Sequence, residues 1–231
     1  MNDNDKSSLA DFLGGDHARL KGYLGSAAFN AVGRSYAAKY PSEIQNTKWF
    51  SCNLPTFLGQ TKPYCQKPEL AELASLELAL KDAFEAPEVS QVSLEEFVKI
   101  APEDLSACTM VLHPSVRRLR FSTNATSLWA ALTCAELPPR PERLDEPLEL
   151  IAWRQGPSPR FRMLGCEEAA ALDAAAKAIP FSELCDLIAN LEGCVSPPKS
   201  ALNYLRGWIE AEVVSELRHG KTILGKSRIR S

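Results

Sequence analysis

LELIAWRQGPSPRFRML, at residues 148–164, consists of two runs of strand-forming residues joined by a segment of glycine and proline. Isoleucine, tryptophan and phenylalanine fit a half-buried pleated surface, so LELIAWRQ and RFRML are both expected to be strands. The intervening Gly156-Pro157-Ser158-Pro159 favours a turn. The stretch therefore predicts a β-hairpin with a loop of about four residues.

Three helices are predicted after this hairpin. The first covers residues 167–177, and the second covers residues 181–190, where leucines recur at helical spacing. The third is expected to begin with Ser196 as its N-cap and Pro197 as its first residue. The apolar face of this third helix is formed by Leu202, Leu205, Trp208 and Ile209. A sheet followed by three short helices is the order found in winged-helix-like domains.

One more strand is predicted at residues 107–112, ACTMVL, which lack helical spacing and run into His113-Pro114. Together with the hairpin it gives a three-stranded antiparallel sheet. The expected fold class is α+β, with a helical N-terminal domain at residues 1–100 and a small winged-helix-like domain at residues 101–231. The proline-rich run at residues 136–147 is interpreted as a linker or a long loop.

The clearest helix of the N-terminal domain is PELAELASLELALKDAF, at residues 68–84. Apolar side chains recur in it at spacings of three and four residues, which places them on one stripe of a helix. These are Leu70, Leu73, Leu76, Leu80 and Phe84. The stripe is expected to face the core of the domain.

Composition and charge restrict the class of partner. The 231 residues are 45% hydrophobic and 24% charged, with a formal net charge of -3. A protein that binds nucleic acid through phosphates normally has a basic face, and here the only strongly basic stretch is at residues 218–230. No segment has the roughly 20 apolar residues of a membrane helix, and the polar N-terminus does not resemble a signal peptide. We therefore expect a cytoplasmic protein that contacts neither membrane nor nucleic acid.

The reactive residue types form no recognisable catalytic motif. The three histidines, His17, His113 and His219, lie far apart and outside any HExxH or Cys/His ligand spacing. No GxSxG elbow, Walker-type loop or GxGxxG loop is present. The seven cysteines are odd in number and lack a CxxC pair, which is typical of reduced cytosolic thiols. We expect no catalytic residue, no resident metal and no cofactor.

Recognition is the remaining class of function. A three-stranded sheet has open edges, and an edge strand offers unpaired backbone donors and acceptors. A peptide can pair with such an edge as an added strand while its alternate side chains enter pockets beside a helix. The alternative, that the linker simply covers the edge, stays open at this point.

Several stretches resemble one family in their order and spacing. PELAELASLELALKDAF is similar to its pattern P-x-L-x-x-L-A-x-L-E-x-A, and VLHPSVRRLRFSTNATSLW to its strand that ends in His-Pro and continues to a Trp. LIAWRQGPSPRFRMLGCEEAAAL resembles its hairpin and acidic helix start, and LNYLRGWIEAEVV its terminal helix. LGSAAFNAVGRSYAAKYPS and LPTFL match its early helices. The family is the HvfC/BufC type, long labelled a DNA-binding domain and similar to the methanobactin-biosynthesis partner protein.

The resemblance implies a non-catalytic partner of a multinuclear non-haem iron oxygenase of TIM-barrel fold, which would hold the iron. It implies that the helical N-terminal domain docks on this enzyme. It also implies that the leader of a ribosomally made precursor peptide adds a strand beside the third strand and under the third helix. Carried over to this chain, the peptide-binding residues are Phe161, Arg162 and Met163 on the strand, and Leu202, Leu205, Arg206 and Ile209 on the helix.

Two other functions compete with this interpretation. A winged-helix-like domain also reads DNA, and Arg117, Arg118 and Arg120 would then contact phosphates. The acidic net charge argues against a DNA-binding regulator. An independent metalloenzyme would have to hold metal in the isolated chain.

Overall fold

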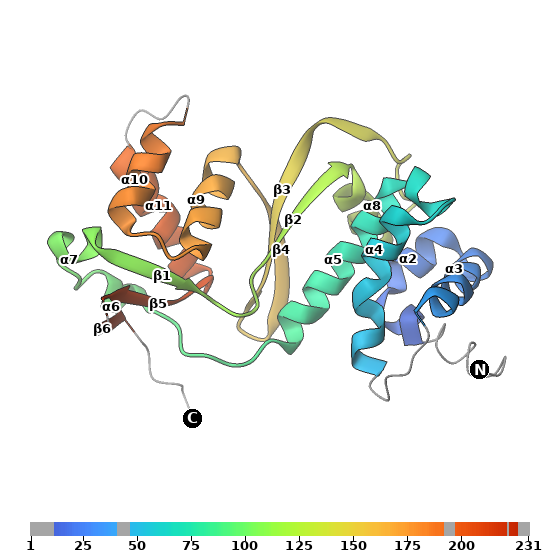
Figure 1. Cartoon of the computed structure of the whole chain (residues 1–231), viewed down its shortest axis with the longest axis horizontal. Coiled ribbons are helices and arrows are strands. Elements are labelled where there is room, and N and C mark those ends of the chain that lie inside the picture. The colour runs from blue at the N-terminus through green and yellow to red at the C-terminus, as the bar shows by residue number, and fades with distance from the viewer. Residues whose placement is uncertain (1–11, 41–46, 192–196, 221, 226–231) are drawn as a thin grey trace. The chain divides into compact units, whose positions relative to one another are not determined.

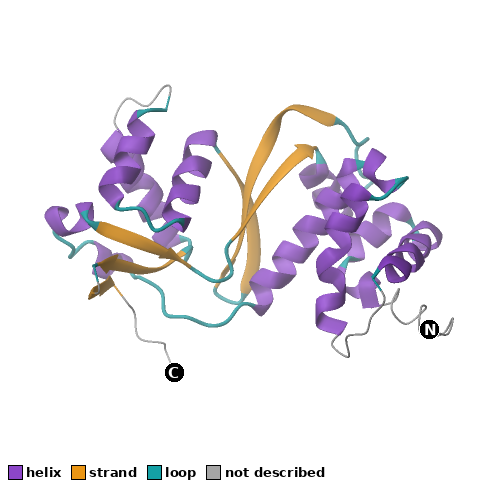
Figure 2. Cartoon of the chain, viewed as in Figure 1, coloured by secondary structure: helices purple, strands orange, loops and turns teal. Residues whose placement is uncertain are grey.

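The structure is a computed structural model that describes residues 12–40, 47–191, 197–220 and 222–225. The expected N-cap Ser196, the thiol of Cys194 and the basic residues Lys221, Lys226, Arg228 and Arg230 lie outside the described residues. The fold class is α+β, as predicted, with helices and strands both well represented (Figure 2). The strands form two sheets of three, in the orders β1-β5-β6 and β2-β3-β4.

The chain divides into two compact units. The N-terminal unit comprises residues 1–81 and 119–148, and the C-terminal unit comprises residues 82–118 and 149–231. The division differs from the single boundary near residue 100 that was expected from the sequence. Because each unit contains two separated segments, a truncation at residue 100 would remove part of the C-terminal unit, including the core residue Val92.

The N-terminal unit consists mainly of helices (Figure 1). They are α2 (Ala18–Leu24), α3 (Ser26–Lys39), the 3₁₀ helices η1 (Thr47–Asn53) and η2 (Tyr64–Gln66), α4 (Leu54–Gln60), most of α5 (Pro68–Glu85) and α8 (Ala125–Thr133). The large side chains Phe29, Tyr36 and Phe57 are fully buried in this unit. The helical character expected of the N-terminal part is therefore observed in this unit.

The apolar stripe of α5 is only partly the one predicted. Leu70, Leu73 and Leu76 are buried as expected, whereas Phe84 is 60% exposed. Ala79 and Ala83 are buried in the last two turns. An ideal helix has 3.6 residues per turn. A stripe predicted from spacings of three and four residues therefore gradually departs from the buried face along a long helix.

Glu72 of α5 fixes the end of β2 (Arg117–Thr123) within the N-terminal unit. Its carboxylate accepts hydrogen bonds from the backbone N–H groups of Ser122 at 2.6 Å and Thr123 at 3.1 Å. The hydroxyls of the same two residues donate to it at 2.9 and 2.5 Å. Four donors on one carboxylate use nearly all of its acceptor capacity. The end of the strand is therefore held to the helix.

The C-terminal unit contains the remaining helices and the first sheet. The helices are α6 (Leu94–Phe97), α7 (Pro102–Ser106), α9 (Cys166–Ala176), α10 (Phe181–Ala189) and α11 (Pro197–Glu210). Ser93 and Glu96 form a capping box at the start of α6. The ends of α9 and α10 lie within one residue of the predicted ones. One hydrophobic core joins these helices to the strands through Ile151, Trp153, Leu164, Leu172, Leu184, Leu205, Trp208 and Leu217.

The pairing of the strands differs from the prediction. The strand expected at residues 107–112 is present as β1 (Cys108–Leu112), but it pairs antiparallel with β5 (Val214–His219), which in turn pairs with β6 (Thr222–Gly225). The predicted hairpin is present as β3 (Arg143–Gln155) and β4 (Ser158–Leu164), and its third strand is β2. The single three-stranded sheet of hairpin and distant strand was therefore wrong.

The turn of the hairpin is shorter than expected. Gln155 pairs with Ser158, which leaves two residues in the loop rather than four. The first of them, Gly156, has φ +56. Glycine at this position accepts the positive φ that tight two-residue hairpins require, and proline can follow it.

No helix among the described residues is long and apolar enough to cross a membrane.

A buried polar pair lies under the start of α2 in the N-terminal unit. The carboxylate of Glu77 accepts hydrogen bonds from the N–H groups of Arg19 at 2.7 Å and Leu20 at 3.1 Å. His17 is fully buried, and its Nδ1 lies 3.8 Å from Glu77 Oε2. Burial raises the pKa of Glu77 to about 7 although the N–H groups oppose the rise, and burial lowers the pKa of His17 to about 4. Burial therefore favours a neutral pair.

These shifts predict the pH dependence of the free energy of unfolding. Native Glu77 keeps its proton to a higher pH than the unfolded chain, so its contribution falls as pH rises from about 4.5 to 7. Native His17 stays neutral while the unfolded histidine is protonated, so its contribution rises between about pH 4 and 6.5. The two cancel in the parent protein. In Glu77→Gln only the contribution of His17 remains, so the free energy of unfolding should rise by on the order of 3 kcal/mol between about pH 4 and 6.5. Urea denaturation across this pH range measures it.

The reciprocal variant is the control for this prediction. His17→Gln should leave only the contribution of Glu77, so its stability should decrease over pH 4.5 to 7. Parallel profiles for the parent and both variants would contradict the assignment of neutral forms to the pair.

Candidate functional site

The strand residues expected to bind a peptide lie on β4, which is an edge of its sheet. In the order β2-β3-β4, only β3 flanks β4 among the described strands (Figure 1). Met163 is 59% exposed, whereas Phe161 and Arg162 are half-buried. The edge that the sequence analysis required is therefore present, although the sheet is a different one from that predicted.

The register of the hairpin determines which amides of β4 face the open edge. In a two-residue hairpin the residues that close the loop, here Gln155 and Ser158, form a hydrogen-bonded pair. Such pairs alternate with non-hydrogen-bonded ones, so Phe161 and Met163 direct their N–H groups away from β3. Pro159 lies two residues before Phe161 and therefore also faces the edge with its backbone nitrogen. Proline has no N–H, and an edge strand tolerates it at such a position because no ladder hydrogen bond is lost. The N–H groups of Phe161 and Met163 therefore point toward the edge of the sheet.

Glu168, in the first turn of α9, connects β4 to α11. Arg162 on β4 donates to it from Nη1 at 2.8 Å and from Nη2 at 2.5 Å. Trp208 on α11 donates from Nε1 at 2.9 Å. Burial alone would raise the pKa of this carboxyl group, but the hydrogen bonds from Arg162 and Trp208 lower the pKa below its ordinary value. The predicted strand and helix thus meet through Glu168, a residue outside the predicted peptide-binding set.

The four residues predicted on the third helix fall into two groups. Leu202 is 39% exposed, and Arg206 is exposed and pairs with Glu210 at 2.9 Å. Leu205 and Ile209 are 0% and 3% exposed and belong to the core of the C-terminal unit. A side chain without exposed surface makes its contacts within its own protein. Leu205 therefore supports the position of α11 rather than offering a surface to a ligand.

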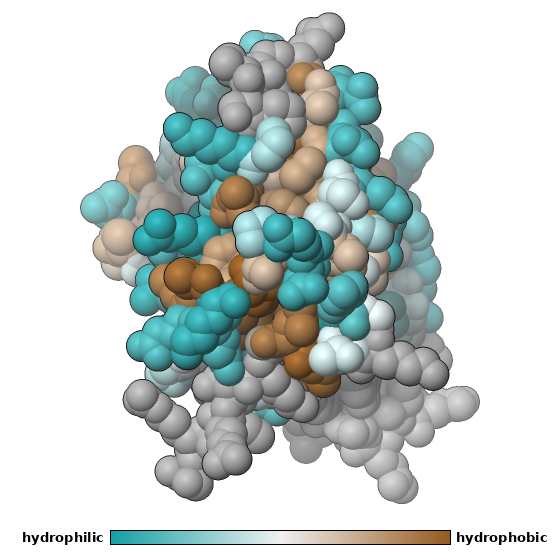
Figure 3. Space-filling model, turned by 90° about the vertical axis from the view of Figure 1, so that its left-hand side faces the viewer, coloured by the Kyte–Doolittle hydropathy of each residue, from teal (hydrophilic) through white to brown (hydrophobic). Residues whose placement is uncertain are grey.

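Exposed apolar side chains of the C-terminal unit extend beyond the predicted residues. Figure 3 views the chain from the side of α7 and β6 and shows apolar surface interspersed with polar side chains. Val98 is 78% exposed and Ile223 is 41% exposed. Scattered exposed apolar side chains are normal on soluble proteins, so they do not by themselves mark a site.

The arginines considered for DNA binding have intramolecular partners. Arg118 forms ion pairs with Glu149 at 2.9 Å and Asp173 at 2.8 Å, and it donates to the carbonyl of Leu150. Arg117 donates to the carbonyl of Pro114 at 2.8 Å. Neutralised guanidinium groups contribute less to phosphate binding than free ones.

His113 has a structural environment. Its Nδ1 accepts a hydrogen bond from the N–H of Ser115 at 3.1 Å and lies 2.7 Å from the Ser115 hydroxyl. The same hydroxyl accepts from the N–H of Arg154 at 3.0 Å. Burial lowers the pKa of His113, and the nearby charge of Arg154 adds to the effect. His113 therefore holds the turn that follows β1 through its contact with Ser115.

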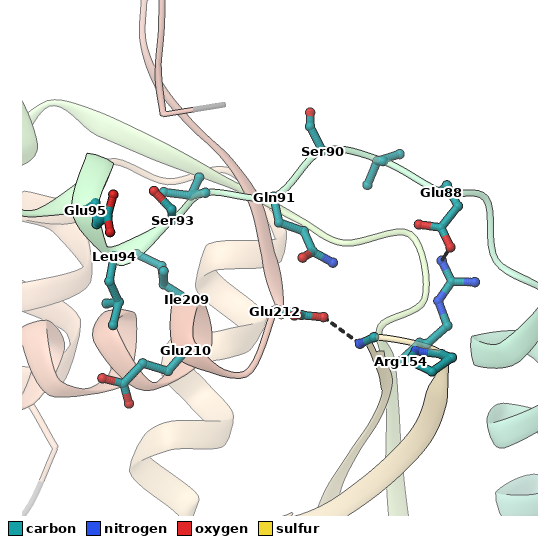
Figure 4. Close-up of a pocket in the computed structure, with 14 residues that line it drawn as sticks. Glu88, Ser90, Gln91, Ser93, Leu94, Glu95, Arg154, Ile209, Glu210 and Glu212 are labelled. Carbon is teal, nitrogen blue, oxygen red and sulfur yellow. Dashed lines mark hydrogen bonds and ion pairs between the residues drawn. The ribbon is translucent and has the colours of Figure 1, made fainter. Parts of the chain in front are cut away.

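A pocket of about 850 Å³ in the C-terminal unit was not anticipated from the sequence (Figure 4). It is lined by residues 88–95, the end of α11 and the hairpin turn. Four glutamates and one arginine are among its lining residues: Glu88, Glu95, Glu210, Glu212 and Arg154. The segment 88–92 has no periodic pattern, so no signal in the sequence could have located the pocket.

Among the described residues, no group of three or more His, Cys, Asp or Glu side chains is placed to hold a metal ion. No protein-family model matches the chain, and no curated protein matches it at a significant level. The family resemblance therefore stays a prediction from sequence motifs.

Glu168→Gln tests the connection between β4 and α11. The amide keeps an acceptor but loses the charge that Arg162 contacts, so we expect a loss of about 2 kcal/mol in the free energy of unfolding at pH 7. Because the pKa of Glu168 is lowered, its contribution is present above about pH 4.5 and is lost as pH falls through the folded pKa. The difference between parent and variant should therefore shrink near pH 3, as measured by urea denaturation.

Glu167→Gln is the matched control on the neighbouring residue. Its Oε1 is buried without a hydrogen-bond partner among the described residues, so removing the charge should cost little or increase stability. Equal losses in Glu167→Gln and Glu168→Gln at pH 7 would contradict a specific role for Glu168.

Proposed function

We propose that this chain is a non-catalytic, cytoplasmic partner protein that binds the leader of a ribosomally made precursor peptide and presents it to a multinuclear iron oxygenase. The observation that carries the proposal is the edge position of β4, where the N–H of Met163 points away from β3 beside the exposed Met163 side chain. An exposed edge of this kind is where β-augmentation takes place.

In the proposed complex the leader pairs with β4 as a fourth strand of the β2-β3-β4 sheet. Its backbone bonds to the amide of Met163, and its apolar side chains pack on the exposed surface of the Met163 side chain. Arg162 is committed to Glu168, so it holds the strand in place rather than binding the peptide. Leu202 and Arg206 of α11 are the accessible helix residues of the predicted set, with Leu205 and Ile209 beneath them.

The order of hairpin, α9, α10 and α11 supports the assignment of the C-terminal unit to a winged-helix-like peptide-recognition element. The tie of β4 to α9 and α11 through Glu168 supports it further, since a strand that receives a peptide must be rigid. In this proposal the oxygenase docks on the helical N-terminal unit and holds the iron. That part rests on the family resemblance.

Met163→Pro is the sharpest test of the strand. Proline removes a donor that points away from β3, so the hairpin should persist while the bond to an added strand is lost. We expect at least tenfold weaker binding of the leader, measured by fluorescence anisotropy with a labelled peptide. A neighbouring open reading frame that encodes a short Cys-rich peptide would supply the leader sequence.

Met163→Val is the matched control, because valine keeps the N–H and favours a strand. It should bind the leader within a fewfold of the parent. Circular dichroism must first show that both variants are folded. A folded Met163→Pro protein with unchanged affinity would exclude β4 as the peptide-binding strand.

The location of iron tests the partner assignment. When the full chain and the candidate oxygenase are mixed and separated by size exclusion, iron should elute with the oxygenase and with the complex, and the isolated chain should contain no stoichiometric iron, zinc or copper. Elemental analysis of each fraction measures this. Tightly bound iron together with oxygenase turnover by the chain alone would overturn the proposal.

A further inference from the structure

We propose that the pocket lined by residues 88–95 and the end of α11 binds an extended peptide segment in which lysine or arginine alternates with apolar residues. The pocket lies wholly in the C-terminal unit. It involves none of the β4 residues 159–164, so this inference does not rest on the function proposed for β4. Its volume of about 850 Å³ is within the usual range of ligand sites.

The segment 88–92 is held at both ends by side-chain hydrogen bonds. Upstream, Arg154 donates from Nη1 to the carbonyls of Phe84 at 3.1 Å and Ala86 at 3.0 Å. Downstream, the N–H of Ser93 donates to Glu96 at 3.0 Å in the capping box. Within the described residues, no backbone–backbone hydrogen bond involves residues 88–92.

A segment that lacks backbone–backbone hydrogen bonds and lies beside a pocket offers a peptide the same kind of contact as a sheet edge does. A segment of five residues in extended conformation spans roughly 17 Å, enough to align several peptide groups. Because its two ends are fixed, little further conformational entropy is lost when a peptide pairs with it.

The floor of the pocket is apolar. Val89 and Leu94 are half-buried and so present apolar surface to the pocket, whereas Val92 and Ile209, which also line it, are each 3% exposed and belong to the core. Figure 4 shows Leu94 and Ile209 close together at one end of the pocket, with Gln91 and Glu212 nearer the middle. Apolar side chains of a bound peptide can therefore lose contact with water at this floor.

The rim of the pocket is acidic. Glu88 forms an ion pair with Arg154 at 3.2 Å, which neutralises that end. Glu95, Glu210 and Glu212 remain. Glu212 Oε2 accepts from the N–H of Gly156 at 2.6 Å, and neither this bond nor the exposed pair of Glu210 with Arg206 uses both carboxylate oxygens.

Together the floor and the rim select the occupant. Successive side chains of an extended peptide point to opposite sides, so alternate residues can meet the apolar floor while the others meet the carboxylates. Arg206 pairs with Glu210 as Arg154 pairs with Glu88, so cationic side chains mainly complement Glu95 and Glu212, and acidic side chains would be repelled. A partner with alternating apolar and basic residues therefore fits this pocket, whereas an acidic or uncharged one does not.

The probe is the acetylated and amidated heptapeptide Val-Lys-Val-Lys-Val-Lys-Val, titrated against the full chain at low salt by isothermal calorimetry. Glu95→Lys combined with Glu210→Lys should weaken its binding at least tenfold. Glu103→Lys, in the first turn of α7 and outside the pocket, is the matched charge control and should change the affinity less than twofold. A heptapeptide with glutamate in place of each lysine should not bind.

A modified peptide and a protein variant locate the contact. A heptapeptide with N-methyl groups on alternate residues cannot donate hydrogen bonds along one of its two edges. Of the two peptides methylated at odd or at even positions, one should bind at least tenfold more weakly than the unmethylated heptapeptide. Met163→Pro should leave binding of the unmethylated heptapeptide unchanged. If charge reversal at the pocket has no effect, or if Met163→Pro abolishes binding, the pocket is not the site and this inference fails. Neither result would decide whether a leader peptide binds β4.

Discussion

The carboxylate of Glu168 is the interaction on which the candidate recognition surface depends. It accepts from Arg162 on the edge strand and from Trp208 on the last helix, while its own residue begins α9. Partial burial makes an unpaired charge costly there, so the two donors and the carboxylate stabilise one another only when all three are in place. The position of β4 beside α9 and α11 is therefore fixed by a polar contact as well as by packing. This also fixes the direction of the N–H groups of β4 that point away from β3.

How far the sequence predicted the fold depends on how local each signal is. β1, α9 and α10 were located to within one residue, because helical periodicity and strand composition act over short distances. The hairpin was also located, but β3 begins at Arg143 rather than at residue 148, and the loop has two residues rather than four. The pairing of β1 with β5 joins residues about a hundred positions apart, such as Val111 and Glu216, and no local pattern specifies it. The interleaved units arise for the same reason: Glu72 binds Ser122 through a contact that spacing cannot reveal.

The candidate site shows the same limit at the level of single side chains. Helical spacing placed Leu202, Leu205 and Ile209 on one face, but it cannot distinguish a face that lines a groove from one that fills a core. Burial shows that Leu205 belongs to the core and that Leu202 is accessible. Glu168 lies in the first turn of a helix, where the helix dipole favours negative charge. Its two long-range donors depend on tertiary structure, so the sequence does not reveal them.

An open strand edge is also a liability, and β4 carries features that limit promiscuous pairing. Pro159 removes one of the outward donors, and the neighbouring Arg160 is exposed on the same short strand. Glutamates surround the segment 88–92, for which no backbone–backbone hydrogen bond is found within the described residues. Charge and proline weaken pairing with an arbitrary strand, but they weaken it less for a partner whose side chains complement the surroundings. In the complexes proposed above, the features that limit unwanted strand pairing would therefore also favour one peptide over another.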